Sequence, residues 1–277
     1  MSAFLDEMAA GSRARVREAA AARSLAELES AARATPAPPP LRLDASGFDL
    51  IAELKLRSPA AGTLAAAAGE DVAARVTGYA RAGAAAVSVL TEPSRFDGTL
   101  AHLTAAAAAL RPCAVPAMRK DFIVDPYQVY EARAAGAAGV LVILRMLPKA
   151  ETQALLECAR SLGLFVLLEA FDADDIALLH ELVAAHRGPN VLLAGVNCRD
   201  LATLEVVPSR LLELSSLLPA RVPRVAESGV NSTEDARAVA AAGYSLVLVG
   251  SALMRGGDGG TLAASLIAAG RAARAMG

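Results

Sequence analysis

Cysteine is scarce in this chain, and its pattern argues against two kinds of site. Cys113, Cys158 and Cys198 are odd in number, widely spaced and without a Cys-x-x-Cys pair. A disulfide framework or a zinc site would need paired or closely spaced cysteines. We therefore expect neither disulfides nor a metal, as is typical of proteins in the reducing cytoplasm.

The chain also lacks a long run of one charge and a clear membrane segment. Lys and Arg total 27 against 29 for Asp and Glu, which argues against nucleic acid or an anionic membrane as a partner. Asp6 and Glu7 stand where a signal peptide would be basic and then apolar, so export is not expected. The longest uncharged run, residues 238–254, is divided by Gly243 and Ser245 into a helix end and a strand. We expect a monomer whose partner is a small molecule.

Eight short apolar runs recur along the chain and indicate its fold. They are centred on Ile51, Val87, Ala117, Leu141, Val166, Leu193, Val225 and Val247, at intervals of 22 to 36 residues. Each interval can hold one helix, and several predicted helices end in a glycine that can take the left-handed closing conformation. Apolar strands that alternate with helices predict a parallel sheet covered on both faces.

Eight such units predict an α/β fold, a single (β/α)8 TIM barrel over residues 47–277. An open doubly wound sheet is the alternative, but no Gly-rich dinucleotide turn follows the first strand. Residues 1–46 predict a helical extension packed on the barrel, with a helical pattern over residues 4–34 that four prolines end at residues 36–40. The sequence leaves open whether this extension only packs on the barrel or forms a lid over a substrate.

The first predicted strand carries an acid and a base two residues apart. In residues 51–59 (IAELKLRSP), Glu53 and Lys55 point to the same side, because side chains alternate along a strand. Burying two charges is costly unless they pair or take part in chemistry. The strand therefore predicts the floor of an active site rather than plain core.

Polar residues close most of the other predicted strands. Active sites of such barrels lie at the carboxyl ends of the strands, where this sequence has Glu53, Lys55, Ser58, Lys120, Glu169, Asn197, Arg199, Glu227, Ser228, Gly229, Gly250 and Ser251. Two lysines and two glutamates could exchange protons at neutral pH. Each lysine could instead be a Schiff-base nucleophile or half of a structural ion pair.

The pairs Ser228-Gly229 and Gly250-Ser251 follow the last two strands and predict an anion site. Loops at these places in such barrels often direct backbone N–H groups at a phosphate, and glycine permits a close approach. One Ser-Gly pair alone is more typical of an ordinary turn. Two pairs on adjacent strands favour a phosphate.

Seven motifs, in order at the predicted strand ends, make the sequence resemble the indole-3-glycerol-phosphate synthase family. They are IAELK with SP (51–59), VSVLTE (87–92) with Phe96 and Gly98, RKDFIVDPYQ (119–128), LE (168–169), GVNCRDL (195–201), AESG (226–229) and LVGSALM (248–254). The resemblance covers nearly the whole chain. It implies extra N-terminal helices across the barrel mouth, and no metal or organic cofactor.

The resemblance also implies a reaction of tryptophan biosynthesis, in which 1-(2-carboxyphenylamino)-1-deoxyribulose 5-phosphate becomes indole-3-glycerol phosphate, carbon dioxide and water. Lys120 would be the general acid on the ribulose carbonyl, and Lys55 would engage the anthranilate carboxylate and is a candidate for the acid of the dehydration. Glu169 would be the general base, with Glu53 and Asn197 orienting the lysines and the substrate. Which glutamate takes the ring proton stays open.

The remaining implied contacts divide into a polar and an apolar group. Arg199 and Ser58 match positions near the substrate carboxylate and phosphate, and Ser228, Gly229, Gly250 and Ser251 match the phosphate cradle. The side chains that would wall the anthranilate ring are Phe96, Phe122, Leu141 and Ile143. An apolar wall would keep a cationic intermediate from bulk water.

The sequence departs from the family pattern in the loop after the first strand. Leu56 replaces a common lysine, and Ala60 and Ala61 replace Ser-Lys, so the loop loses positive charge near the phosphate. We expect a loss of substrate affinity of about 1 kcal/mol per lost phosphate contact, and substrate titration of the Ala61→Lys variant would test this. Two rival functions stay open: another phosphate-binding barrel enzyme, such as phosphoribosylanthranilate isomerase, and a barrel that serves as a non-catalytic scaffold.

Overall fold

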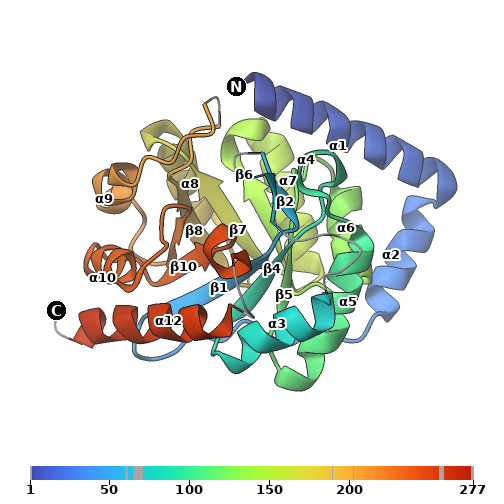
Figure 1. The fold of residues 1–277 in the computed structure, drawn as a ribbon. Helices are drawn as coiled ribbons and strands as arrows, with labels where there is room; N and C mark the ends of the chain where they lie inside the picture. Colours follow the sequence, from blue (N-terminus) through green and yellow to red (C-terminus); the bar gives the residue numbers. More distant parts are fainter. Residues whose placement is uncertain are drawn as a thin grey trace.

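The computed structural model describes residues 2–59, 62–64, 71–188, 190–201, 203–255 and 259–275. Within these residues, eight parallel strands close into a barrel (Figure 1). In order along the chain they are β1 (Asp49–Leu54), β4 (Ala86–Leu90), β5 (Ala117–Lys120), β6 (Gly139–Ile143), β7 (Phe165–Ala170), β8 (Leu192–Asn197), β9 (Arg224–Glu227) and β10 (Leu246–Val249). All eight predicted apolar runs fall on these strands, so the predicted TIM barrel is confirmed.

The ring closes at β1, which pairs with the last strand on one side and with β4 on the other. Ile51 lies in register with Leu248 of β10 and with Ala86 of β4. Nearly every strand residue is buried, because the strands face a packed barrel interior on one side and helices on the other. This explains why the strands form continuous apolar runs in the sequence.

The helices between the strands form the outer layer. They are α3 (Val72–Arg81), α5 (Leu100–Leu110), α6 (Pro126–Ala134), α7 (Lys149–Ser161), α8 (Ala173–Ala185), α10 (Thr233–Ala241) and α12 (Gly260–Ala275), with the shorter α4 (Pro93–Phe96), α9 (Ser209–Ser215) and α11 (Ser251–Met254) and the 3-10 turns η1 (Arg111–Cys113) and η2 (Leu144–Met146). Gly83, Gly136, Gly163 and Gly243 follow helix ends with φ between 69° and 95°. Glycine takes this conformation without a steric penalty, which confirms the predicted helix endings.

The N-terminal residues form two helices, α1 (Ala3–Ala22) and α2 (Leu25–Ala34), where the sequence pattern suggested one helical stretch. The division falls at Ser24, whose side chain accepts from the Glu27 backbone N–H while the Glu27 carboxylate accepts from Ser24. This capping box starts a new helix in a new direction. Helix α1 contacts η2 and α6, and α2 packs against α6 on the outside of the barrel (Figure 1).

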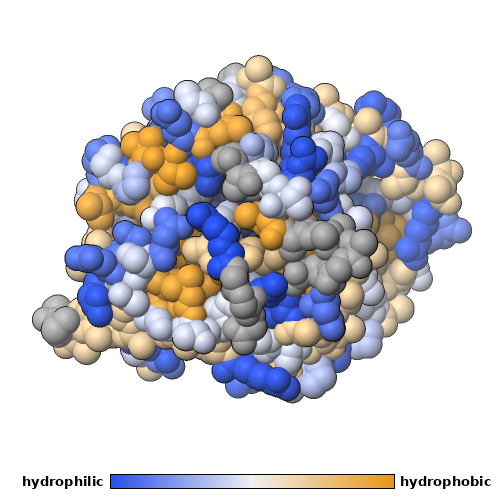
Figure 2. All heavy atoms as spheres, in the orientation of Figure 1, coloured by the Kyte–Doolittle hydropathy of each residue, from blue (hydrophilic) through white to orange (hydrophobic). Residues whose placement is uncertain are grey.

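A small antiparallel hairpin, β2 (Arg57–Ser58) and β3 (Gly62–Thr63), follows β1 and was not predicted. Two-residue strands are too short to give a periodic signal in the sequence. No helix among the described residues is long and apolar enough to cross a membrane. The face shown in Figure 2 is mixed in hydropathy, with apolar side chains gathered around α9 and the loop before it.

Candidate active site

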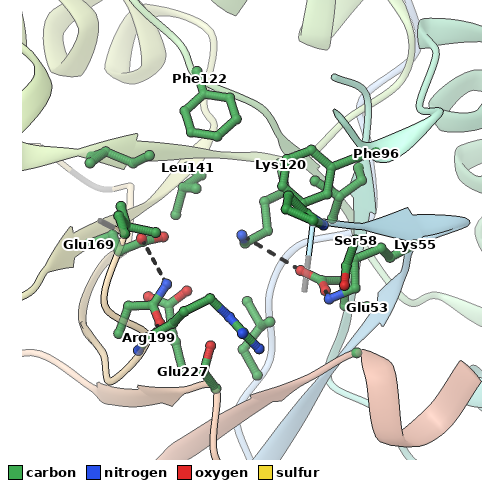
Figure 3. Close-up of a pocket in the computed structure, with 18 of the residues that line it drawn as sticks. Glu53, Lys55, Ser58, Phe96, Lys120, Phe122, Leu141, Glu169, Arg199 and Glu227 are labelled. Carbon is green, nitrogen blue, oxygen red and sulfur yellow. Dashed lines mark hydrogen bonds and ion pairs between the residues drawn. The ribbon is translucent and has the colours of Figure 1, made fainter. Parts of the chain in front are cut away.

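Side chains from β1 and β5 meet at the carboxyl end of the barrel. Lys55 Nζ lies 2.7 Å from Glu53 Oε1, and Lys120 Nζ lies 3.7 Å from Glu53 Oε2 (Figure 3). The Glu53 side chain is 4% exposed, and the two lysines are 12% and 18% exposed. One carboxylate thus holds two amines in a largely water-excluded pocket.

The pKa values in this group follow from burial and mutual charge. Burial alone would raise the pKa of Glu53, but the charges of Lys55 and Lys120 outweigh it and lower the pKa. Burial would lower the pKa of Lys120, but Glu53, Glu169 and Glu227 together raise it. Both groups are therefore charged at neutral pH, and Lys120 carries a proton that it can donate.

A second carboxyl group lies across the pocket on β7. Asn197 Nδ2 donates to Glu169 Oε1 at 3.0 Å, and Asn197 Oδ1 accepts from the Arg199 backbone N–H at 2.9 Å. Burial raises the pKa of Glu169, against the opposing effects of Lys120 and Asn197. This carboxyl group titrates closer to neutrality than an ordinary glutamate, as suits a general base.

Glu227, at the end of β9, was not among the predicted site residues, yet it lines the same pocket. Burial first, and then the charge of Glu169, raise its pKa well above the usual range. Both of its carboxyl oxygens are buried, and the neighbouring Glu169 carboxyl group can share a hydrogen bond with it when one of the two is protonated. The sequence placed it at the end of a predicted strand but did not indicate a role for it in the site.

Apolar side chains line the pocket next to the charged group. Figure 3 shows Leu141 beside Glu169 and Phe96 beside Lys120, and the same pocket is lined by Phe4, Phe122 and Ile143. The ring centroid of Phe122 lies 5.8 Å from that of Phe4 in an edge contact, and 6.2 Å from that of Phe96. Because Phe4 belongs to α1, the N-terminal extension contributes directly to the pocket wall.

The loops after β9 and β10 complete the site. Ser228 and Gly250 line the main pocket, whereas Gly229 and Ser251 line an adjoining cavity. Ser228 and Gly229 both have left-handed φ values, 67° and 76°. A Cβ on Gly229 would lie 2.8 Å from the Cys198 Sγ atom, so this turn needs glycine for space as well as for conformation.

Every other predicted site residue lines the main pocket: Glu53, Lys55, Ser58, Phe96, Lys120, Phe122, Leu141, Ile143, Glu169, Asn197 and Arg199. Leu56, the first departure from the family pattern, is buried. Ala60 and Ala61 lie outside the described residues. No group of three or more His, Cys, Asp or Glu side chains that could hold a metal occurs within the described ranges.

The strand ends of a closed barrel bring amines, carboxyl groups and a glycine-lined cavity together. This arrangement defines the class, a (β/α)8-barrel enzyme with its candidate site at the carboxyl ends of the strands. The family model described as indole-3-glycerol phosphate synthase matches residues 5–266. The chain belongs to this family.

Curated relatives agree with this assignment, and a solved structure shares the fold. The indole-3-glycerol phosphate synthase of Mycobacterium avium (strain 104) is 42% identical over 270 residues, covering 96% of this chain and 94% of the relative. That of Parafrankia sp. (strain EAN1pec) is 45% identical over 228 residues, covering 82% and 81%. The structure of 3-hexulose-6-phosphate synthase from Salmonella typhimurium matches with a TM-score of 0.59 at 15% identity, over 80% of this chain and 98% of that chain, which shows the shared fold alone.

Proposed function

We propose that the protein closes the indole ring of 1-(2-carboxyphenylamino)-1-deoxyribulose 5-phosphate, releasing carbon dioxide and water to give indole-3-glycerol phosphate. The observation that carries this proposal is the pocket itself. It combines two lysines and buried carboxyl groups with an aromatic wall and an anion-binding end. These are the groups that an aromatic, phosphorylated substrate undergoing proton transfers would need.

Lys120 is the general acid of ring closure in this proposal. As the ring carbon that bears the carboxylate attacks the ribulose carbonyl carbon, the Lys120 ammonium group donates a proton to the carbonyl oxygen. The raised pKa of Lys120 ensures that this proton is present at neutral pH. The ion pair with Glu53 fixes the direction of the amine.

Lys55 binds the anthranilate carboxylate until that group leaves as carbon dioxide. Afterwards Lys55 is free to protonate the hydroxyl group that leaves as water. Its 2.7 Å contact with Glu53 supports this assignment, because the same carboxylate then orients both acids.

Glu169 is the general base that removes a proton from the former C1 carbon of the ribulose as the hydroxyl group leaves as water, which completes the aromatic indole ring. Its raised pKa suits a base that works near neutrality. Glu227 has the higher tendency to keep its proton, because burial and the charge of Glu169 both favour its neutral form. We therefore assign the base to Glu169 and a neutral, space-filling and polar role to Glu227.

The phosphate occupies the end of the pocket formed by Ser228, Gly229, Gly250 and Ser251, and the aromatic ring lies against Phe96, Phe122, Leu141 and Ile143. The three cysteines are free thiols, which is consistent with a protein that acts in the reducing cytoplasm. Arg199 lines both parts of the site and can reach the substrate from its open side.

The product can be observed directly, because the chain contains no tryptophan. Purified protein mixed with the proposed substrate should develop indole fluorescence on a background free of indole emission. Phosphoribosylanthranilate should remain unchanged under the same conditions. Turnover of phosphoribosylanthranilate without indole formation would favour the isomerase, and loss of neither substrate would favour a scaffold.

A further inference from the structure

A second cavity adjoins the main pocket at its phosphate end. Ser58, Arg199, Leu248 and Gly250 line both spaces, so the two lie side by side. The second cavity is also lined by Gly229, Ser251 and Arg255. It therefore places one cationic side chain that does not line the main pocket beside the loops proposed to hold the phosphate.

Arg255 follows the short helix α11, and its guanidinium group is only partly used by the protein. Nε donates to the Ser251 carbonyl oxygen at 3.2 Å. No other hydrogen bond and no ion pair of Arg255 involves the described residues. By contrast, two other arginines form ion pairs with carboxylates: Arg57 Nη1 lies 3.7 Å from Asp97 Oδ1, and Arg210 Nη2 lies 3.7 Å from Asp200 Oδ2. Arg255 is thus oriented by one contact while its two terminal NH2 groups are available to an anion.

The remainder of the anion site has few cations of its own. Leu56 is buried and apolar, and the sequence has alanine at positions 60 and 61. Arg199 donates through Nη1 to the Leu204 carbonyl oxygen at 2.8 Å, which engages part of its guanidinium group. A phosphate dianion held by backbone N–H groups would gain from a second guanidinium group.

We propose that Arg255 binds the substrate phosphate and supplies positive charge that the loop after β1 lacks. This inference rests on the proposed function, because it adds a binding residue to the same site. Arg255 contacts only the phosphate end, far from the reacting carbon atoms, so it contributes to binding of substrate and transition state alike. Its loss should raise KM and leave kcat nearly unchanged.

The test compares Arg255→Gln and Arg255→Lys with Arg274→Gln, which removes the same charge from an exposed position on α12. We expect KM to rise roughly 5- to 20-fold in Arg255→Gln, because a charge-assisted hydrogen bond to a partly exposed phosphate is lost. Arg255→Lys should recover part of this loss, and Arg274→Gln should match the wild type. The inhibition constant for inorganic phosphate should rise together with KM in Arg255→Gln.

A second readout does not depend on turnover. Inorganic phosphate should raise the melting temperature of the wild type and of Arg274→Gln, and it should do so less for Arg255→Gln. Unchanged KM and phosphate protection in Arg255→Gln would overturn the role of Arg255, as would an equal change in Arg274→Gln. If the wild type forms no indole product, the proposed function fails. The change in melting temperature with inorganic phosphate then decides the role of Arg255 by itself. No phosphate-dependent change in the wild type would overturn the role of Arg255.

Discussion

Lys120 lies among three carboxyl groups that raise its pKa, and Glu53 is the nearest of them. Lys120→Ala should lower kcat by roughly 10²-fold or more, as expected for the loss of a general acid. Lys149→Ala is the matched control, since Lys149 is an exposed lysine that pairs with Glu181 on the outer helices. Rates of indole formation would show this, and near-normal turnover of Lys120→Ala would remove Lys120 from the role.

Gly195 makes room for the buried glutamate pair. A Cβ at this position would lie 2.2 Å from Glu227 Oε1, so Gly195→Ala must displace the Glu227 carboxyl group from its place beside Glu169. We expect kcat to fall about 10-fold or more, because a small displacement of catalytic groups is costly. Glu227→Asp, which shortens the side chain by one methylene, should restore part of this loss when combined with Gly195→Ala. A double variant no faster than Gly195→Ala alone would contradict this explanation.

The base assignment predicts a change in pH dependence. Glu169 must be ionised to accept a proton, so kcat should fall when the pH drops below the pKa of Glu169. Because this pKa is raised, the fall should begin at a higher pH than it would for an ordinary glutamate. Asn197→Leu removes the 3.0 Å hydrogen bond that stabilises the ionised form, so the pKa of Glu169 should rise further. The acid limb of the kcat profile should therefore move to higher pH. An unmoved limb would argue that another group is the base.

Single residues differed in how well the sequence predicted them. Glu53 and Lys55 were found because two charges on one face of an apolar strand need an explanation, and the structure brings both into the pocket. Glu227 was noted at the end of a predicted strand but was given no role in the site. Its closeness to Glu169 depends on the register between β8 and β9 and on the space at Gly195, which the sequence does not state.

At the scale of elements, α1 is tied to the strand end that carries Lys120. Arg15 Nη2 lies 2.7 Å from Asp121 Oδ1, and the same carboxylate accepts from Thr91 at 2.7 Å, Arg119 at 2.9 Å and the Phe122 backbone N–H at 2.8 Å. Burial would raise the pKa of Asp121, but the charges of Arg119 and Arg15 lower it. The buried carboxylate thus joins α1 to the chain on both sides of Asp121.

Arg15→Met should lower the free energy of unfolding by about 1–3 kcal/mol, because a buried carboxylate loses one of its charged partners. It should also lower kcat, since Phe122 and Lys120 lose a restraint. Arg13→Met is the matched control on α1, because Arg13 lies 3.9 Å from Glu151 and both are about half exposed; its cost should stay below about 0.5 kcal/mol. Denaturant unfolding and steady-state kinetics measure both effects, and equal losses in the two variants would contradict a specific role of Arg15.

The elements themselves were largely predictable because each has a local cause. The apolar runs predicted the barrel strands, and glycines predicted the ends of four helices. The division between α1 and α2 was visible only in a local signal, the spacing of Ser24 and Glu27 that forms a capping box. The contact of α1 with the pocket could not be predicted from the sequence. It depends on where Phe4 and Arg15 lie relative to residues about 80 to 120 positions further along the chain.

At the scale of the whole molecule, the barrel explains how residues far apart in sequence form one site. Parallel strands place every carboxyl end on one face of the ring, so residues from 53 to 251 converge there. Eight repeats of strand and helix made this architecture predictable. The tertiary arrangement of pocket, adjoining cavity and extension required the structure.

The most direct test of the central claim is a single-turnover experiment that records carbon dioxide release and indole fluorescence together, with enzyme in excess over 1-(2-carboxyphenylamino)-1-deoxyribulose 5-phosphate. If the amines and carboxyl groups of this pocket close the ring and drive its decarboxylation, the two products form in equal amounts in the wild type. Both should slow together in Lys120→Ala. Carbon dioxide release without indole, or equal rates in the two proteins, would contradict the account.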